Sequence, residues 1–352
     1  MKRTEIIKID PDNPDIHEIK RAAAIIKNKG LVAFPTETVY GLGADGLCAD
    51  AVDKIFLAKD RPKGNPLILH IASPDDMPQV AKEIPPIAKK LIQTFWPGPL
   101  TLVLPKKPHV PYQVSAGLPT IGLRMPDNII ALTLIAETGT ILAAPSANIS
   151  GRPSPTNAKH VVDDMWNKID LILDGGSTSL GVESTVLDLT EDPPRILRPG
   201  SVTYEDLTDV VGEVQKPLGG QEGKLSPGQS YQGLKYTHYS PGIPFFLVEG
   251  EPQAVIRRIQ KEAGKYRDRA EKTGIMSSEE NKEQYHGYAD IVKSLGPKGD
   301  MTQIAANLYR VLRDFETSGI HILFAEGYSE AGLGFAVMNR LREATKGHII
   351  YA

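Results

Sequence analysis

The hydrophobic residues follow two spacings that alternate along most of the chain. Between residues 14 and 30, Ile16, Ile19, Ala23 and Ile26 recur at helical spacing, and Gly30 is suited to end the helix. Helices are also expected over residues 50–59 and 80–95. Short apolar runs indicate buried strands at residues 31–34, 67–71, 100–104, 120–126, 141–144, 171–174, 182–188 and 196–198. This alternation predicts an α/β fold.

A stretch rich in Gly, Pro, Ser and Gln separates this region from a second one. The stretch has weak hydrophobic periodicity, which is typical of a linker. Beyond it, strand and helix patterns alternate again, and they predict a small Rossmann-like α/β domain with parallel strands but no complete dinucleotide fingerprint. The predicted division is a first domain over residues 1–211, the linker over 212–243 and the second domain over 244–352.

Composition and charge narrow the class of protein. The 352 residues are 41% hydrophobic and 24% charged, as in soluble globular proteins, and they are too many for one ordinary core. A net charge of −3 and a pI near 6.3 argue against a protein that coats nucleic acid non-specifically. Cys48 is the only cysteine, which excludes an intrachain disulfide and a cysteine-based metal cluster. Because the N-terminus has no apolar segment and no run reaches about 20 apolar residues, we expect a cytoplasmic location.

Three cations lie at and just beyond the end of the helix expected over residues 50–59. Lys59, Arg61 and Lys63 lie close together, and Pro62 must stop the helix. Lys59 and Arg61 are two residues apart where the chain leaves helical geometry, so both side chains can reach one polyanion. Cations also favour the negative end of a helix dipole, and this explanation suffices for an isolated pair. Further polar clusters at other strand ends favour an anion site instead.

Hydroxyl and amide side chains gather where two of the predicted strands end. Residues 35–43 contain threonines, one carboxylate and two glycines, and Ser146, Asn148 and Ser154 follow the strand expected over 141–144. Ligands of α/β proteins bind at the carboxyl ends of strands, and small residues allow a close approach to the backbone. Each cluster alone is common in loops. Together they predict a ligand site at this edge of the sheet.

Two polar residues interrupt otherwise apolar strands. A buried guanidinium at Arg124 needs either a protein carboxylate or a ligand anion as its partner. Its planar fork suits two-point contact with a carboxylate, which makes a free amino acid a reasonable ligand. His70 lies in the run 67–71, where a histidine is more often a satisfied core residue than a functional one. Arg198 places one more cation at a strand end.

Several of these stretches together carry the motifs of a known family. Lys59-x-Arg61, followed by Asn65-Pro-Leu, and Ser146-x-Asn148 within Ala-Pro-Ser-Ala-Asn-x-Ser-Gly resemble the signature of the YrdC/TsaC family of threonylcarbamoyl-adenylate synthases. The Pro-Thr-Glu-Thr-Val-Tyr-Gly-Leu run and Arg124 in its strand are similar too. The resemblance covers about residues 10–210. The tail, with its Lys-Tyr-Thr-His-Tyr-Ser-Pro linker motif, resembles the longer, two-domain branch of that family.

This resemblance implies a fold and a reaction. The expected fold is a YrdC-like twisted open α/β sheet domain followed by a smaller Rossmann-like α/β domain. The expected reaction converts L-threonine, bicarbonate or CO₂, and ATP into L-threonylcarbamoyl-AMP and pyrophosphate. The product would serve N6-threonylcarbamoyladenosine formation in tRNAs that read A-starting codons. Transfer at phosphorus needs positioning and charge neutralisation more than a covalent nucleophile, which suits the cations and hydroxyls found here.

The resemblance also implies roles for individual residues. Arg124 is expected to bind the threonine carboxylate, in a pocket completed by Thr38, His70, Ala144 and Ser184. The ATP side is expected to comprise Lys59, Arg61, Asn65, Thr120, Ser146, Asn148, Ser154, Arg198 and Tyr239, with Lys59, Arg61, Ser146 and Asn148 as the catalytic set. Tyr239 and His238 of the linker motif would cap the nucleotide. Aromatic anchors that pin the linker to a domain surface remain an equal alternative.

The implied cofactor is Mg²⁺ carried by ATP, without a protein metal site. The implied partners are L-threonine, bicarbonate or CO₂, ATP, a downstream threonylcarbamoyl transferase complex and a weak tRNA contact, with no membrane. A structured-RNA-binding module without turnover is the alternative, and its affinity would fall steeply with salt. A second alternative is a carbamoyl-adenylate enzyme of the hydrogenase-maturation type, which shares the fold of the family that this chain resembles. Such enzymes normally carry acylphosphatase and zinc-finger modules, and this sequence shows no pattern for either.

Overall fold

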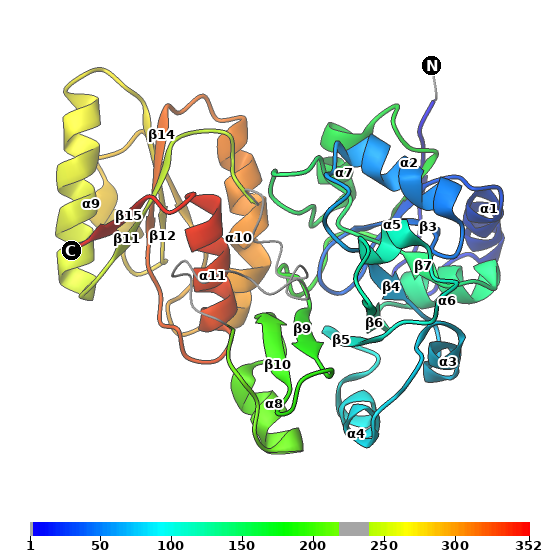
Figure 1. The fold of residues 1–352 in the computed structure, drawn as a ribbon. Coiled ribbons are helices and arrows are strands. Elements are labelled where there is room, and N and C mark those ends of the chain that lie inside the picture. The colour runs from blue at the N-terminus through cyan, green and yellow to red at the C-terminus, as the bar shows by residue number, and fades with distance from the viewer. Residues whose placement is uncertain (1–2, 218–238) are drawn as a thin grey trace. The chain divides into compact units, whose positions relative to one another are not determined.

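The computed structural model describes residues 3–217 and 239–352, which form two compact units (Figure 1). The first unit comprises Met1–Ser150, Pro155–Ser179 and Glu183–Lys235, and the second comprises Gly151–Ser154, Leu180–Val182 and Tyr236–Ala352. Most of the predicted linker 212–243, including His238, lies outside the described residues. The domain boundaries inferred from the sequence therefore stay a prediction.

A ten-stranded mixed sheet forms the centre of the first unit. Its strands are β1 Glu5–Lys8, β2 Val32–Phe34, β3 Gly41–Asp45, β4 Ile68–His70, β5 Leu100–Pro105, β6 Thr120–Arg124, β7 Leu142–Ala143, β8 Leu171–Asp174, β9 Thr185–Asp188 and β10 Arg195–Arg198. They lie in the order β1-β8-β2-β3-β7-β4-β6-β5-β9-β10. The pairs β1–β8, β2–β8, β4–β6 and β5–β9 are parallel, and the others are antiparallel.

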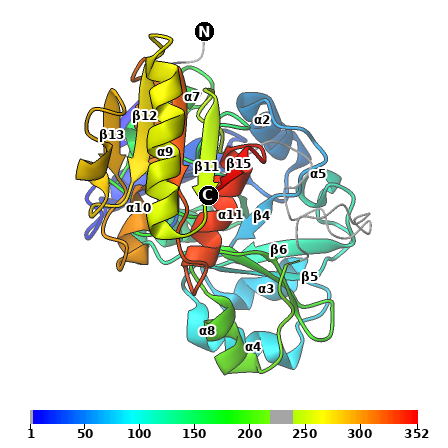
Figure 2. The ribbon, with the colours of Figure 1, turned by 90° about the vertical axis from the view of Figure 1, so that its left-hand side faces the viewer.

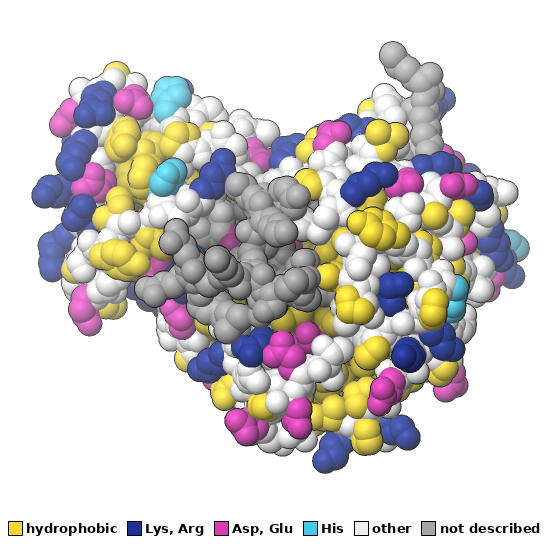
Figure 3. Space-filling model, in the orientation of Figure 1, with side chains coloured by type: hydrophobic (Ala, Val, Ile, Leu, Met, Phe, Trp, Pro, Cys, Tyr) yellow, Lys and Arg dark blue, Asp and Glu magenta, His cyan; other side chains and the backbone are white. Residues whose placement is uncertain are grey.

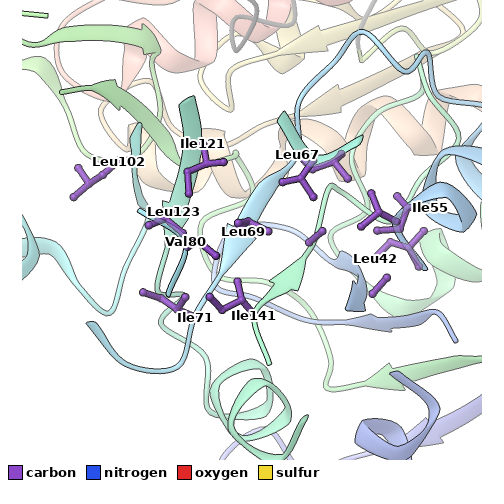
Figure 4. Close-up of a cluster of buried hydrophobic side chains, with 14 of the residues drawn as sticks. Leu42, Ile55, Leu67, Leu69, Ile71, Val80, Leu102, Ile121, Leu123 and Ile141 are labelled. Carbon is purple, nitrogen blue, oxygen red and sulfur yellow. The ribbon is translucent and has the colours of Figure 1, made fainter. Parts of the chain in front are cut away.

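Helices and apolar side chains cover both faces of this sheet. The helices are α1 Ile16–Lys27, α2 Ala49–Lys59, α3 Met77–Val80, α4 Pro86–Phe95, α5 Tyr112–Ser115, α6 Ile129–Thr138, α7 Ala158–Met165 and α8 Tyr204–Val211. Because side chains alternate along a strand, Val32 and Phe34 pack with α1 and α6, whereas Ala33 joins a second cluster. Figure 4 shows that second cluster, in which Leu69 of β4 and Leu123 of β6 lie side by side. With both faces covered, the strand ends are left for polar side chains.

Local chemistry explains where several elements begin and end. α1 starts after Asp15, whose carboxylate accepts a hydrogen bond from the backbone N–H of His17. The prediction of one helix over residues 80–95 is wrong in its first part, because α3 ends at Val80 and α4 starts only at Pro86. Two successive prolines at 85 and 86 cause the break, because a proline disfavours helical geometry in the residue before it.

The second unit is built on a five-stranded parallel sheet. Its strands are β11 Phe245–Glu249, β12 Thr273–Ser277, β13 Ile291–Ser294, β14 Ile322–Glu326 and β15 Ile349–Tyr351, in the order β13-β12-β14-β11-β15. Its helices are α9 Pro252–Arg267, α10 Met301–Glu316 and α11 Gly334–Ala344. Figures 1 and 2 show α9 on one face of this sheet and α10 with α11 on the other. The predicted Rossmann-like alternation with parallel strands is confirmed.

The surface of the described residues carries charges of both signs. On the face shown in Figure 3, basic and acidic side chains are interspersed, in line with the small net charge of the chain. Within residues 3–217 and 239–352, none of the helices combines the length and the apolar content that crossing a membrane requires.

Candidate active site

The side chain of Lys59 joins the two signature motifs of the first unit. Lys59 is only 1% exposed, and its Nζ donates hydrogen bonds to the backbone oxygens of Ser146 at 2.5 Å and Asn148 at 2.6 Å. The Lys59 carbonyl in turn accepts a hydrogen bond from the Ser150 N–H at 2.9 Å. A buried ammonium group requires such partners. Lys59 therefore orders the loop that follows β7, which a cation that only balances a helix dipole would not do.

The turn after α2 presents the rest of the basic motif. Asp60 adopts a left-handed conformation with φ of 50° and ends the helix, so that the Arg61 N–H reaches back to the Phe56 carbonyl at 2.9 Å. The helix thus ends before Pro62. Arg61 Nη2 donates to the Pro66 carbonyl at 3.2 Å, and Asn65 is 4% exposed. Arg61 and Asn65 are therefore held on one tight turn between α2 and β4.

Arg124 lies at the carboxyl end of β6 and is 4% exposed. Its Nη2 forms an ion pair with Glu37 Oε2 at 2.7 Å and donates to Thr38 Oγ1 at 3.0 Å, while its Nε donates to the Gly98 carbonyl at 3.3 Å. Of the two partners predicted for this guanidinium, the protein carboxylate is present. Glu37 lies in the stretch 35–43 that we expected at a ligand site, but no role was predicted for it. Its signal was a carboxylate within an apolar, threonine-rich segment.

His70 lies directly beside Arg124, because the two residues are partners in the parallel β4–β6 pair. The His70 ring is buried, and its Nδ1 faces the Ile68 carbonyl at 3.3 Å. Burial and the neighbouring Arg124 cation lower the pKa of His70 to about 3. The Ala144 N–H donates to the Ile68 carbonyl from the end of β7. Arg124 thus contacts Thr38 and lies beside the neutral imidazole of His70, whereas Ala144 lies beside Ile68 at the start of β4, because β7 runs antiparallel to β4.

Ser184 and Arg198 contact each other directly. Arg198 Nε and Nη2 donate to the Ser184 carbonyl at 3.1 and 2.9 Å, and Nη2 also donates to Ser184 Oγ at 3.1 Å. Ser184 Oγ lies 2.8 Å from Thr101 Oγ1 on β5. The structure therefore pairs a residue expected on the threonine side with one expected on the ATP side. Thr120 begins β6, about 13 Å along the strand from Arg124, so these two are not neighbours.

Ser154 and Tyr239 belong to the second unit. Ser154 is buried in the short segment Gly151–Ser154, whose Pro153 carbonyl accepts hydrogen bonds from Nε and Nη2 of Arg313 at 3.0 and 2.5 Å. Tyr239 stacks on Tyr309 with ring centroids 5.1 Å apart, and the Arg340 guanidinium lies 5.6 Å from its ring. Among the described residues, no three His, Cys, Asp or Glu side chains are grouped so that they could hold a metal ion.

Two family models match the chain, one for each half. The Sua5/YciO/YrdC model, described as "Telomere recombination", matches residues 24–200. The model described as "Threonylcarbamoyl-AMP synthase, C-terminal domain" matches residues 202–345.

Similar proteins align over nearly the whole chain. A threonylcarbamoyl-AMP synthase of Pyrococcus abyssi is 48% identical over 95% of this chain and 95% of its own length. A threonylcarbamoyl-AMP synthase of Bacillus subtilis is 45% identical over 95% of this chain and 94% of its own. The crystal structure of P. abyssi Sua5 complexed with L-threonine has a TM-score of 0.92 at 46% identity and covers 99% of each chain.

The fold and these matches define a nucleotidyl-transferring α/β enzyme with a YrdC-like domain and a smaller Rossmann-like domain, which confirms the predicted fold class. The chain belongs to the threonylcarbamoyl-AMP synthase family, in its longer Sua5 form. The resemblance inferred from Lys59-x-Arg61 and Ser146-x-Asn148 is therefore confirmed.

The buried His70 makes stability depend on pH. Because the pKa of His70 lies below its value in the unfolded chain, the unfolded state binds more protons at acidic pH. The contribution of the neutral ring to the free energy of unfolding is therefore complete above about pH 6.5 and is lost as the pH falls toward 3. Between pH 7 and 5 the loss is about 2 kcal/mol in the free energy of unfolding. Urea unfolding at both pH values should show a shallower pH dependence for His70→Asn than for the original chain. Equal slopes would contradict a neutral buried imidazole.

Proposed function

We propose that this chain forms L-threonylcarbamoyl-AMP and pyrophosphate from L-threonine, bicarbonate or CO₂, and ATP. The observation that carries the proposal is the similarity over nearly the full length to proteins named threonylcarbamoyl-AMP synthase, together with the close structural match to a relative solved with L-threonine. The product would pass to a threonylcarbamoyl transferase complex for the modification of tRNAs that read A-starting codons, with at most a weak tRNA contact by this chain. We place the reaction in the cytoplasm.

The threonine side of the proposed site lies at the carboxyl ends of β4 and β6. Arg124 would bind the threonine carboxylate, and no partner of its Nη1 is found among the described residues. Thr38, His70, Ala144 and Ser184 would complete the pocket. Because the pKa of His70 is far below neutrality, its imidazole can contact the amino acid as a neutral hydrogen-bonding group.

The nucleotide side of the proposed site is built on the two motifs that Lys59 links. Nζ of Lys59 holds the carbonyls of Ser146 and Asn148, so any displacement of this ammonium group changes the loop that carries both residues. Positioning and electrostatic stabilisation dominate transfer at phosphorus. We assign Lys59, Arg61, Ser146 and Asn148 to this step. Asn65, Thr120, Ser154, Arg198 and Tyr239 are assigned to ATP binding.

The chemistry expected at this site is attack by a carbamate on the α-phosphorus of ATP. The threonine amine captures CO₂, one carbamate oxygen forms the new bond to phosphorus, and the bond to the pyrophosphate oxygen breaks. Mg²⁺ bound to the triphosphate would neutralise charge on the leaving group. The residues of this chain then hold the two substrates in line and shield the developing charge.

Pyrophosphate release from ATP by the purified chain tests this proposal. Release should require both L-threonine and bicarbonate, and omission of either should reduce it to background. A structured-RNA-binding module without turnover would release none under any combination. ATP cleavage that does not depend on threonine would exclude the proposed substrate.

A further inference from the structure

Glu37 is a buried carboxylate with unused hydrogen-bonding capacity. It lies between β2 and β3 and is 7% exposed. Its Oε2 is 2.7 Å from Arg124 Nη2, yet the geometry of this ion pair is not that of a hydrogen bond. Neither Oε1 nor Oε2 accepts a hydrogen bond from any described residue. The backbone carbonyl of Glu37 accepts a hydrogen bond from Ser179 Oγ at 3.3 Å.

This situation is unusual enough to need a physical explanation. An ionised carboxylate offers about four acceptor sites, and buried polar atoms are almost always hydrogen-bonded. The single ion pair with Arg124 leaves most of this capacity unfilled. A ligand that brings several N–H donors would fill it.

The zwitterion of a free amino acid supplies the missing donors and charge. If the carboxylate of the amino acid binds Arg124, the guanidinium faces two anions, and Glu37 lies beside a second negative charge. An α-ammonium group next to Glu37 restores the balance, because it carries one positive charge and three N–H donors. The neighbouring His70 cannot provide this charge, because its imidazole is neutral. The Arg124–Glu37 pair thus matches the two charged groups of an amino acid.

We propose that Glu37 binds the α-ammonium group of L-threonine and selects amino acids against hydroxy acids. This inference rests on the proposed function and deepens it. Arg124 recognises a carboxylate, which both classes of molecule carry. Glu37 distinguishes them, because a hydroxy acid brings no positive charge, so that the Glu37 carboxylate and the ligand carboxylate would both depend on the charge of Arg124.

The test compares L-threonine with its hydroxy-acid analogue, 2,3-dihydroxybutyrate of matching stereochemistry, as a competitor. For the unmodified enzyme, the inhibition constant of the analogue should exceed the KM for threonine by about 100-fold or more, because loss of a buried charged partner has effects of this size. In Glu37→Gln, which keeps shape and removes charge, the KM for threonine should rise by about 100-fold. The preference over the analogue should fall to about tenfold or less, with the KM for ATP nearly unchanged.

Asp50→Asn is the matched control, because Asp50 is an exposed carboxylate of the same unit that pairs with Lys29 at 2.9 Å. It should change neither the KM for threonine nor the preference. A Glu37→Gln enzyme that keeps both values would show that Glu37 only balances the charge of Arg124, and would overturn the inference. If Glu37→Gln does not fold, the unmodified enzyme decides: a preference below about threefold overturns the inference. Loss of threonine-dependent pyrophosphate release in the unmodified enzyme would instead contradict the proposed function itself.

Discussion

Arg124→Ala is expected to raise the KM for L-threonine by about 100-fold or more while the KM for ATP stays within about threefold. The guanidinium is buried at the carboxyl end of β6, and loss of a buried charged contact to a ligand costs about 2–5 kcal/mol. The Arg124 side chain contacts Glu37, Thr38 and the carbonyl of Gly98. Steady-state kinetics with each substrate varied in turn measures the effect.

Controls separate this effect from a general loss of structure. Removal of Arg124 leaves Glu37 buried without its cation, so the melting temperature should fall as well. Arg124→Lys keeps the charge and loses the planar fork, and it should raise the KM for threonine by a smaller factor. Arg195→Ala is the matched control, because this arginine of the same unit pairs with Glu191 at 2.7 Å. Equal changes in the KM for threonine and for ATP would contradict the assignment of Arg124 to the threonine carboxylate.

Lys59→Met should reduce the rate of adenylate formation by about 100-fold or more and leave threonine binding within about threefold. Methionine retains the apolar part of the side chain but cannot donate to the carbonyls of Ser146 and Asn148. It also removes a cation from the triphosphate side of the proposed site, where charge stabilisation of this size is typical. Pyrophosphate release at saturating threonine measures the first quantity, and calorimetric titration with threonine measures the second.

The neighbouring Lys63 provides the matched control. Its side chain is 64% exposed and pairs with Asp53 at 2.7 Å, so Lys63→Met removes a cation from the same turn without affecting the buried contacts. That variant should keep a rate close to that of the original chain. If Lys59→Met has a much lower melting temperature and loses binding of threonine and ATP together, Lys59 stabilises the fold and does not act in the reaction.

Hydrophobic spacing predicted much of the fold because most elements have one clear apolar face. α1 carries apolar residues at helical spacing, and the structure places this helix within two or three residues of the expected bounds. Hydrophobic spacing did not predict β3, because its glycines at 41 and 43 have no side chain that could contribute to a strand pattern. Strand order was not predictable, since β8 joins β1 and β2 across more than a hundred residues. Such pairings depend on tertiary packing, which local spacing does not encode.

The candidate site was predictable in its residue types and less so in its contacts. The motifs around Lys59, Ser146 and Asn148 identified the family before any geometry was known. They did not show that Lys59 binds the backbone carbonyls of Ser146 and Asn148, because every residue has a backbone carbonyl and the residue type does not indicate which one accepts a hydrogen bond. Nor did they show that Glu37 faces Arg124. A buried ion pair between residues 87 positions apart becomes visible only when the sheet is assembled.

Direct detection of the product tests the central claim most directly. The purified chain would be incubated with ATP, ¹⁵N-labelled L-threonine and ¹³C-labelled bicarbonate, and the quenched mixture analysed by mass spectrometry. The account predicts an adenylate that carries both labels, formed in equal amount to pyrophosphate. An adenylate that carries the threonine label without the bicarbonate carbon, or AMP and pyrophosphate without any labelled adenylate, would contradict it.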